Sequence, residues 1–397
     1  MLRCKKVILF YKIHRKMFKR VIKPPKNKSF FLFGPRGTGK TTWLQNNFPN
    51  AIYINLLLSK NFNNLISDPD SLESFIPDNF FDWVILDEVQ KIPELLDVVH
   101  YLIEKKKFKF ILTGSSARKL KRKNINLLAG RALSYKMYPL TSIELKNNFS
   151  YLHVLKYGTL PAIFSEENIE EYLESYIMYY LKEEIQQEGL TRNLGAFSRF
   201  LKSASFSQGS VLNMSEIARD CSVKRNTVEE YFSILEDLLI AYFIPPFTKR
   251  AKRQLIKSNK FYFFDVGVYR TIRPKGPLDT ESEIDGACLE TFVLQEILAI
   301  SDYYKLGYKI YYWRTKLGKE VDFILYGKKG IIAIEVKRKK KIDRNDLKGL
   351  SLFLKDYPMA KGYLLYGGDE IQYRDNITLL PFDIFFSDVM KIIEGGD

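Results

Sequence analysis

Short runs of apolar residues recur through the first third of the chain and alternate with more polar stretches. The runs cover residues 30–33, 51–55, 83–86 and 108–113. Runs of this length with little polar alternation are typical of strands buried on both faces of a parallel sheet. The pattern therefore predicts an α/β fold for residues 30–150, with a parallel sheet covered by helices on both faces.

The first run leads directly into a glycine-rich loop. Residues 34–41 read Gly-Pro-Arg-Gly-Thr-Gly-Lys-Thr, the GxxxxGK[ST] pattern, and precede a predicted helix at 41–47. Glycines let backbone N–H groups surround phosphates in conformations that a Cβ atom would block, and the positive end of the helix faces the anion. We expect Lys40 to contact the β and γ phosphates of ATP and Thr41 to contact Mg²⁺. The expected nucleotide-binding residues are Gly34, Pro35, Arg36, Gly37, Thr38, Gly39, Lys40, Thr41 and Thr42.

The third apolar run ends in two carboxylates, Asp87 and Glu88. In a P-loop ATPase, Asp87 would hold Mg²⁺ through its water shell and Glu88 would polarise the attacking water. A solvated strand end is the alternative interpretation. The glycine-rich loop upstream favours ATP hydrolysis, so we expect a P-loop ATPase.

Polar side chains also follow the run at 108–113. Thr113 or Ser115 is expected to sense the γ-phosphate, and the sequence does not choose between them. Arg131 is a candidate arginine finger that would reach the γ-phosphate of a neighbouring subunit in a homo-oligomer. An ordinary surface arginine is the alternative for Arg131.

A helical region is expected after the ATPase module. Residues 169–188 carry apolar side chains at three and four spacing without Gly or Pro. This pattern predicts a helix, which we assign to a lid or connector over residues 151–195.

A helix-turn-helix pattern follows. Ser215 is the expected cap of a helix at 216–220, and a second helix is expected at 224–238. With strands predicted at 239–244 and 260–265, the pattern indicates a winged helix, which we assign to residues 196–275. The second helix begins with polar donors that could enter a DNA major groove, whereas a lid or subunit contact is the alternative. These donors are Lys224, Arg225, Asn226 and Thr227.

Two carboxylates and a lysine lie on two adjacent strands predicted near the C-terminus. A hairpin would bring Asp322 and Glu335 together, where they could hold Mg²⁺, and Lys337 would share a strand face with Glu335. The metal and Lys337 would activate a water and stabilise a pentavalent phosphate. Glu290, on an amphipathic helix, could complete the ligand set. The pattern predicts a PD-(D/E)xK nuclease-like domain over residues 276–397, and a hairpin with solvated charges is the alternative.

The excess of basic residues indicates a negatively charged partner. The chain has 62 Lys and Arg against 46 Asp and Glu, a formal net charge of +16. A clustered cationic surface attracts nucleic-acid phosphates or anionic lipid by a force that salt screens. We expect nucleic acid, DNA in particular, as the partner, and a lipid surface as the weaker alternative for the basic N-terminal segment. The basic clusters lie at residues 1–29, 118–123, 249–253 and 337–341.

Cysteine usage and hydropathy argue against other classes of protein. Cys4, Cys221 and Cys288 lie far apart without CxxC spacing, which argues against a zinc site and a disulfide framework. No apolar run approaches the ~18 residues of a membrane span. We therefore expect a cytoplasmic protein without integral membrane association.

Several short motifs occur together over nearly the whole chain. They are Phe33-Gly34-Pro35-Arg36, Leu86-Asp87-Glu88-Val89-Gln90, Leu112-Thr113-Gly114-Ser115-Ser116, Gly130-Arg131, Tyr138-Pro139-Leu140, Lys260-Phe261-Tyr262-Phe263-Phe264-Asp265-Val266-Gly267, Tyr312-Trp313-Arg314 and Glu320-Val321-Asp322-Phe323. In this combination the chain resembles a large prokaryotic family of AAA-like ATPases. Its members join such a module to a winged helix and a C-terminal domain of unknown function with a restriction-endonuclease-like core. The resemblance implies ATP binding and names no substrate.

Two functions are compatible with these expectations. An ATP-hydrolysing enzyme would use its nucleotide state to move the winged helix and the nuclease-like domain on nucleic acid. A regulatory switch would use ATP to drive assembly or partner binding, with a catalytically silent C-terminal domain.

Overall fold

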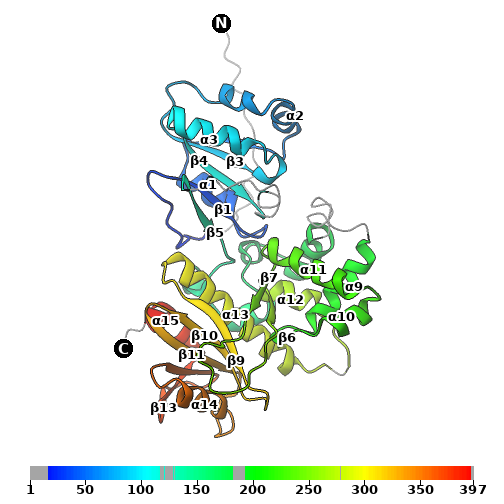
Figure 1. Cartoon of the computed structure of the whole chain (residues 1–397), viewed down its shortest axis with the longest axis vertical. Coiled ribbons are helices and arrows are strands. Elements are labelled where there is room, and N and C mark those ends of the chain that lie inside the picture. Colours follow the sequence, from blue (N-terminus) through cyan, green and yellow to red (C-terminus); the bar gives the residue numbers. More distant parts are fainter. Residues whose placement is uncertain are drawn as a thin grey trace.

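The structure is a computed structural model of the 397-residue chain, which describes residues 17–116, 120, 128, 130–181, 193–277 and 279–394. It confirms the predicted α/β class, with a sheet module, a helical region and a second sheet following one another along the chain (Figure 1). The first half of the basic N-terminal segment, most of the 118–123 cluster and the end of the predicted lid helix lie outside the described residues.

The N-terminal module is built on a five-stranded parallel sheet with the order β2-β3-β4-β1-β5. Strand β4 lies between β1, which precedes the glycine-rich loop, and β3, which ends at Asp87. Because all five strands run the same way, their C-terminal ends meet at one edge of the sheet. The strands are β1 (Ser29–Phe33), β2 (Ile52–Asn55), β3 (Trp83–Asp87), β4 (Lys109–Gly114) and β5 (Ala132–Lys136).

Alternate residues of these strands enter two separate apolar cores. Phe31 and Phe33 pack on the face covered by α3 (Leu95–Lys106). Phe30 and Leu32 pack on the opposite face with Trp43 and Leu44 of α1. Successive strand residues point to opposite faces, so coverage of both faces explains the unbroken apolar runs. The remaining helices are α1 (Lys40–Asn47), α2 (Ser59–Ser67) and 3-10 turns at Pro69–Phe75 and Val89–Lys91.

The helical region lies beside the C-terminal sheet (Figure 1). The predicted helix from residue 169 is not one regular α-helix, because it changes to a π-helical segment at Tyr176–Leu181. The α-helices are α5 (Ser142–Leu145), α6 (Tyr151–Tyr157), α7 (Ile169–Ser175), α9 (Leu194–Ser205), α10 (Met214–Cys221), α11 (Arg225–Asp237) and α12 (Val266–Ile272), with 3-10 turns at Lys146–Asn148 and Pro161–Phe164.

The two predicted helix-turn-helix segments form α10 and α11, but the expected cap was wrong. Asn213 caps α10, because its side chain accepts a hydrogen bond from the Glu216 N–H at 3.3 Å. A three-stranded sheet packs beside these helices in the order β6-β8-β7. The strand expected at the wing is central and fully buried rather than exposed. The strands are β6 (Ser210–Val211), β7 (Ala241–Ile244) and β8 (Lys260–Phe263).

The C-terminal region begins with the long helix α13 and continues into a six-stranded mixed sheet with the order β13-β14-β12-β11-β10-β9. Strands β10 and β11 form the predicted antiparallel hairpin. Helix α13 starts with a capping box made by Thr280 and Glu283. The elements are α13 (Glu281–Tyr303), β9 (Lys309–Arg314), β10 (Glu320–Gly327), β11 (Gly330–Lys337), α14 (Lys348–Asp356), β12 (Lys361–Tyr366), β13 (Gln372–Arg374), β14 (Ile377–Pro381) and α15 (Phe382–Glu394).

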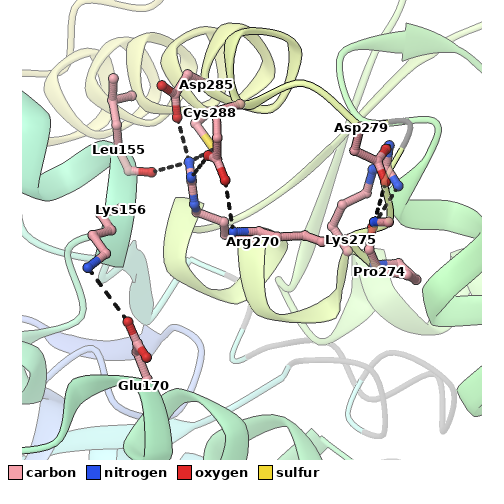
Figure 2. Close-up of polar contacts among 12 residues, drawn as sticks. Leu155, Lys156, Glu170, Arg270, Pro274, Lys275, Asp279, Asp285 and Cys288 are labelled. Carbon is pink, nitrogen blue, oxygen red and sulfur yellow. Dashed lines mark hydrogen bonds and ion pairs between the residues drawn. The ribbon is translucent and has the colours of Figure 1, made fainter.

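Buried contacts join the helical region to α13. Arg270 of α12 donates a hydrogen bond to the Leu155 carbonyl at 3.1 Å and pairs with Asp285 of α13 at 2.6 Å (Figure 2). One apolar cluster runs from α6 and α12 through α13 to β10, β11 and α15. The helical region and the C-terminal sheet therefore share one interior. Among the described residues, no helix is both long and apolar enough to cross a membrane.

Candidate functional site

The glycine-rich loop connects β1 to α1 in a conformation that depends on its glycines. A Cβ atom on Gly34 would lie 2.4 Å from the carbonyl oxygen of Met137. Gly37 and Gly39 have φ angles of +80° and +90°, which side chains disfavour. The loop therefore keeps the curved backbone that a phosphate group requires.

Contacts within the loop fix its functional side chains. The ammonium of Lys40 is buried and donates hydrogen bonds to the carbonyls of Gly34 and Pro35, at 2.6 and 3.1 Å. The hydroxyl of Thr38 donates to the Pro35 carbonyl at 2.7 Å. The hydroxyl of Tyr176, in the π-helical segment, donates to the Arg36 carbonyl at 3.0 Å. Thr41 and Thr42 are exposed on the first turn of α1.

The structure places Asp87 beside this loop. Its buried carboxylate accepts hydrogen bonds from the hydroxyls of Thr113 and Tyr53. The side chain of Tyr53 also interacts with that of Thr41. Burial and the Asp87 charge raise the pKa of Tyr53 above its ordinary range, so this phenol keeps its proton. Tyr53 thus links the two predicted magnesium ligands, and the sequence analysis missed it.

Glu88 follows β3 in a left-handed conformation, with a φ angle of +63°. Its carboxylate accepts a hydrogen bond from the amide of Gln90, which also lies 3.3 Å from the Ser115 hydroxyl. The amide packs so closely on Gly114 that a Cβ there would lie 2.1 Å from the Gln90 Oε1 atom. In the sequence Gln90 stands out only as part of the motif at residues 86–90, and the structure adds it to the candidate site.

Thr113 and Ser115, the two candidates for the γ-phosphate sensor, have different contacts in the structure. Thr113 contacts Asp87, whereas Ser115 contacts the amide that holds Glu88. Arg131 is not brought to the phosphate edge of this chain. It precedes β5 at the opposite end of the sheet, since Ala132 pairs with Ser29, and it forms an ion pair with Glu104 of α3.

These residues fit Mg-ATP. The loop is a cradle that Cβ atoms at Gly34, Gly37 or Gly39 would disturb, and Lys40 lies inside it. Thr41 and Asp87 offer the hydroxyl and carboxylate oxygens that Mg²⁺ prefers.

Arg20 is a third residue whose role the sequence did not reveal, because it lies within a cluster of basic residues. Its guanidinium is buried and donates to the Thr38 carbonyl of the loop at 2.6 Å and to the Tyr138 carbonyl at 2.6 Å. It also pairs with Glu144 at 2.9 Å and donates to the Tyr303 hydroxyl of α13 at 3.1 Å. Arg20 is therefore an internal link between the loop and α13.

The four residues predicted for the nuclease-like site lie in one cluster. Asp322 of β10 accepts a hydrogen bond from the Val336 N–H of β11 at 2.9 Å. Glu335 forms an ion pair with Lys337 at 2.6 Å. The carboxylate of Glu290 interacts electrostatically with that of Asp322.

The charges in this cluster shift one another's pKa values. Burial, followed by the charge of Asp322, raises the pKa of Glu290 to about 8 and holds that of Glu335 well above its ordinary value. Burial opposes the charge on Lys337, but Glu335 and Asp322 outweigh it and raise the pKa of this lysine.

Strand β8 of the middle region adds two side chains that the sequence analysis did not assign to this cluster. The Lys260 ammonium contacts Asp322 at 3.3 Å and also pairs with Glu320, and the Tyr262 hydroxyl donates to Glu290 at 3.1 Å. Within the described ranges, no group of three or more His, Cys, Asp or Glu side chains is arranged to hold a metal ion. The metal-binding role of Glu290, Asp322 and Glu335 stays a prediction.

The predicted DNA-contacting residues are accessible. Lys224, Arg225 and Asn226 are exposed at the start of α11, where Arg225 pairs with Glu229 at 2.9 Å. An open cavity of about 520 Å³ lies between this helix, the start of α10 and the residues before β8. Arg225 and Lys257 line it, together with Asn213 and Ser215.

Comparison with family models assigns residues 26–146 to a family described as "AAA domain". These residues form an AAA-like P-loop domain. In the rest of the chain, residues 148–279 match a domain of unknown function (DUF8612), and residues 285–385 match another domain of unknown function (DUF4143).

Two curated proteins that this chain matches are named as uncharacterized proteins. One, from Methanocaldococcus jannaschii, is 25% identical over 94% of this chain and 88% of its own length. The other, from Haemophilus influenzae, is 24% identical over 64% of this chain and 65% of its own length.

Two solved structures show a distant likeness. The Aeropyrum pernix ORC1 protein, solved in complex with DNA, is 13% identical, with a TM-score of 0.25 over 62% of this chain and 87% of that chain. Protein VC1899 from Vibrio cholerae is 13% identical, with a TM-score of 0.23 over 87% and 97% of the two chains. At these scores neither superposition defines a shared arrangement of domains.

Proposed function

We propose that this AAA protein binds and hydrolyses Mg-ATP at the edge where the glycine-rich loop faces Asp87 and Glu88. One observation carries the proposal: the Tyr53 hydroxyl donates a hydrogen bond to Asp87 and also interacts with the side chain of Thr41. Two side chains that share one hydroxyl partner lie close enough to serve one hydrated Mg²⁺. This contact supports a location of Asp87 beside the glycine-rich loop.

The residues have separate roles in this proposal. Lys40 supplies positive charge to the β and γ phosphates, in place of its contacts with the loop carbonyls. Thr41 and Asp87 hold Mg²⁺, which neutralises phosphate charge when bound. Glu88 orients the attacking water and accepts its proton. Thr113 orients Asp87, and Ser115 is the γ-phosphate sensor.

Two variants test the site. Lys40→Ala should abolish nucleotide binding, because it removes the ammonium from the cradle. Glu88→Gln should retain binding and lose turnover, because the amide cannot accept a proton. Measurements of ATP binding by calorimetry and of phosphate release would separate the two effects. Unchanged turnover in Lys40→Ala would contradict the site assignment.

We propose nucleic acid, DNA in particular, as the partner of this ATPase. The charge of +16 and the exposed Lys224 and Arg225 beside an open cavity support this proposal. ATP turnover measured with and without DNA or RNA tests it, and stimulation that salt suppresses is the expected result. Turnover and binding that are indifferent to both nucleic acids would contradict it.

A second candidate is an ATP-dependent assembly switch with a catalytically silent C-terminal domain. The contact of Lys260 with Asp322 favours this candidate, since the carboxylate already has a cation beside it. Cleavage of DNA or RNA in Mg²⁺ or Mn²⁺ that disappears in Asp322→Ala would instead support a nuclease. Light scattering with and without ATP would detect assembly into a homo-oligomer.

A further inference from the structure

Strand β8 inserts two polar side chains into the carboxylate cluster of the C-terminal domain. Lys260 and Tyr262 are two residues apart, so they project from the same face of the strand. Both side chains are buried. A cluster that the sequence assigned to residues 276–397 is therefore completed by the preceding region of the chain.

The protein itself supplies a partner to each carboxylate. Asp322 receives the Lys260 ammonium at 3.3 Å on one oxygen and the Val336 N–H at 2.9 Å on the other. Glu290 receives the Tyr262 hydroxyl at 3.1 Å, and Glu335 receives Lys337 at 2.6 Å. The buried Oε2 atom of Glu335 has no hydrogen-bond partner among the described residues. This oxygen is the part of the cluster that could still accept a cation.

The position of Lys260 is supported on several sides. Its ammonium pairs with Glu320 as well as Asp322 and lies 5.6 Å from the centre of the Tyr312 ring. Its backbone pairs with Ile244 of β7 and Val211 of β6, so the strand that carries it is held on both edges. A change of side-chain rotamer alone would leave the Lys260 ammonium buried without a charged partner. To leave the cluster, Lys260 would therefore have to move together with the sheet.

We propose that Lys260 is the resident cation of this cluster and that it competes with divalent metal ions for Asp322. A metal ion bound between Asp322 and Glu335 would place two positive charges beside a buried ammonium. The repulsion between these charges is strong where water is excluded. The lysine that precedes the C-terminal domain therefore keeps its nuclease-like cluster free of metal while β8 is in place.

Metal binding to the full-length protein tests the proposal. Mn²⁺ is the probe, and its binding is measured by electron paramagnetic resonance in the absence of nucleotide. All proteins carry Lys40→Ala, so that ATP binding at the glycine-rich loop does not contribute to the signal. Lys260→Met removes the charge and keeps much of the side-chain length. Lys257→Met is the matched control, because Lys257 is an exposed lysine three residues earlier. Thermal melting establishes that each variant is folded.

The expected result is tighter Mn²⁺ binding in Lys260→Met, by on the order of tenfold or more, and no change in Lys257→Met. The gain should disappear in the Lys260→Met/Asp322→Asn double variant. A folded Lys260→Met protein that binds Mn²⁺ no better than its parent would overturn the proposal.

A comparison that leaves Lys260 in place gives an independent test. Weak Mn²⁺ binding that Asp322→Asn does not alter is expected of the parent protein. If the parent protein bound Mn²⁺ tightly and Asp322→Asn abolished this binding, the proposal would be overturned. This holds even if Lys260→Met does not fold. Neither result depends on ATP hydrolysis, so a failure here is distinct from a failure of the proposed ATPase.

Discussion

The guanidinium of Arg20 donates a hydrogen bond to the carbonyl of Thr38, inside the glycine-rich loop. The same side chain reaches Glu144 beside the sheet module and Tyr303 on α13. One buried arginine therefore holds the nucleotide loop against the helix that begins the C-terminal region.

We expect Arg20→Ala to lower the free energy of unfolding and to weaken ATP binding. Loss of the arginine leaves Glu144 buried without its charged partner, at a cost of about 3–5 kcal/mol. The substitution also removes the hydrogen bond from Arg20 to the Thr38 carbonyl of the glycine-rich loop. Urea denaturation and nucleotide titration check the two effects. Lys19→Ala is the control, since Lys19 is exposed and should change neither property.

Gln90 is expected to act as a positioning residue for Glu88. Gln90→Leu preserves the approximate size of the side chain and removes the amide that contacts Glu88 and Ser115. The kcat of ATP hydrolysis should fall on the order of 10- to 100-fold, as is typical when an outer partner of a catalytic group is lost. The KM should change little, because Gln90 does not contact the loop. A rise in KM with unchanged kcat would contradict this role.

Glu296 of α13 gives a prediction for pH. Its Oε1 atom accepts the Ser142 N–H at 2.7 Å, and the Ser142 hydroxyl lies 2.9 Å from Oε2 and 2.8 Å from the Phe386 carbonyl. A hydroxyl has one proton, so a protonated Glu296 completes this set by donating to Ser142. Burial raises the pKa of Glu296 to about 8 from 4.5.

The folded protein therefore keeps this proton between about pH 4.5 and about pH 8, where an unfolded chain has released it. The stability contributed by Glu296 is present at the low end of this range and falls as the pH rises through it, by on the order of a few kcal/mol. Glu296→Gln cannot ionise, so its unfolding free energy should fall less over the same range. Urea midpoints of both proteins at several pH values check this, and parallel curves would refute it.

Gly267 allows two helices to approach closely. A Cβ atom at this position would lie 2.1 Å from the carbonyl oxygen of Tyr157, at the end of α6. Gly267→Ala should destabilise the protein by about 1–3 kcal/mol, the usual cost of overpacking. Gly286→Ala is a matched control inside α13, where nothing lies within 4 Å of the added atom. It should stabilise the protein by about 0.5–1 kcal/mol, as measured by thermal melting.

The arrangement of the candidate nucleotide site was largely predictable because its parts are local in the sequence. A strand, a glycine-rich loop and a helix follow one another at residues 29–47, and the strand with Asp87 carries its carboxylate at its end. Parallel strands then place these ends at one edge of the sheet. Tyr53 and Gln90 could not be assigned, because their roles arise from hydrogen bonds to other segments.

The sequence by itself determined the α/β sheet, the glycine-rich loop and the hairpin with Asp322 and Glu335, since each depends on periodicity and short spacing. Only the tertiary structure decided that Arg20 is internal, that Arg131 faces the opposite end of the sheet, and that Lys260 lies against Asp322. The physical reason is that a charged side chain looks the same in sequence whether water or a buried carboxylate surrounds it. Its partner is chosen by packing between segments that lie far apart along the chain.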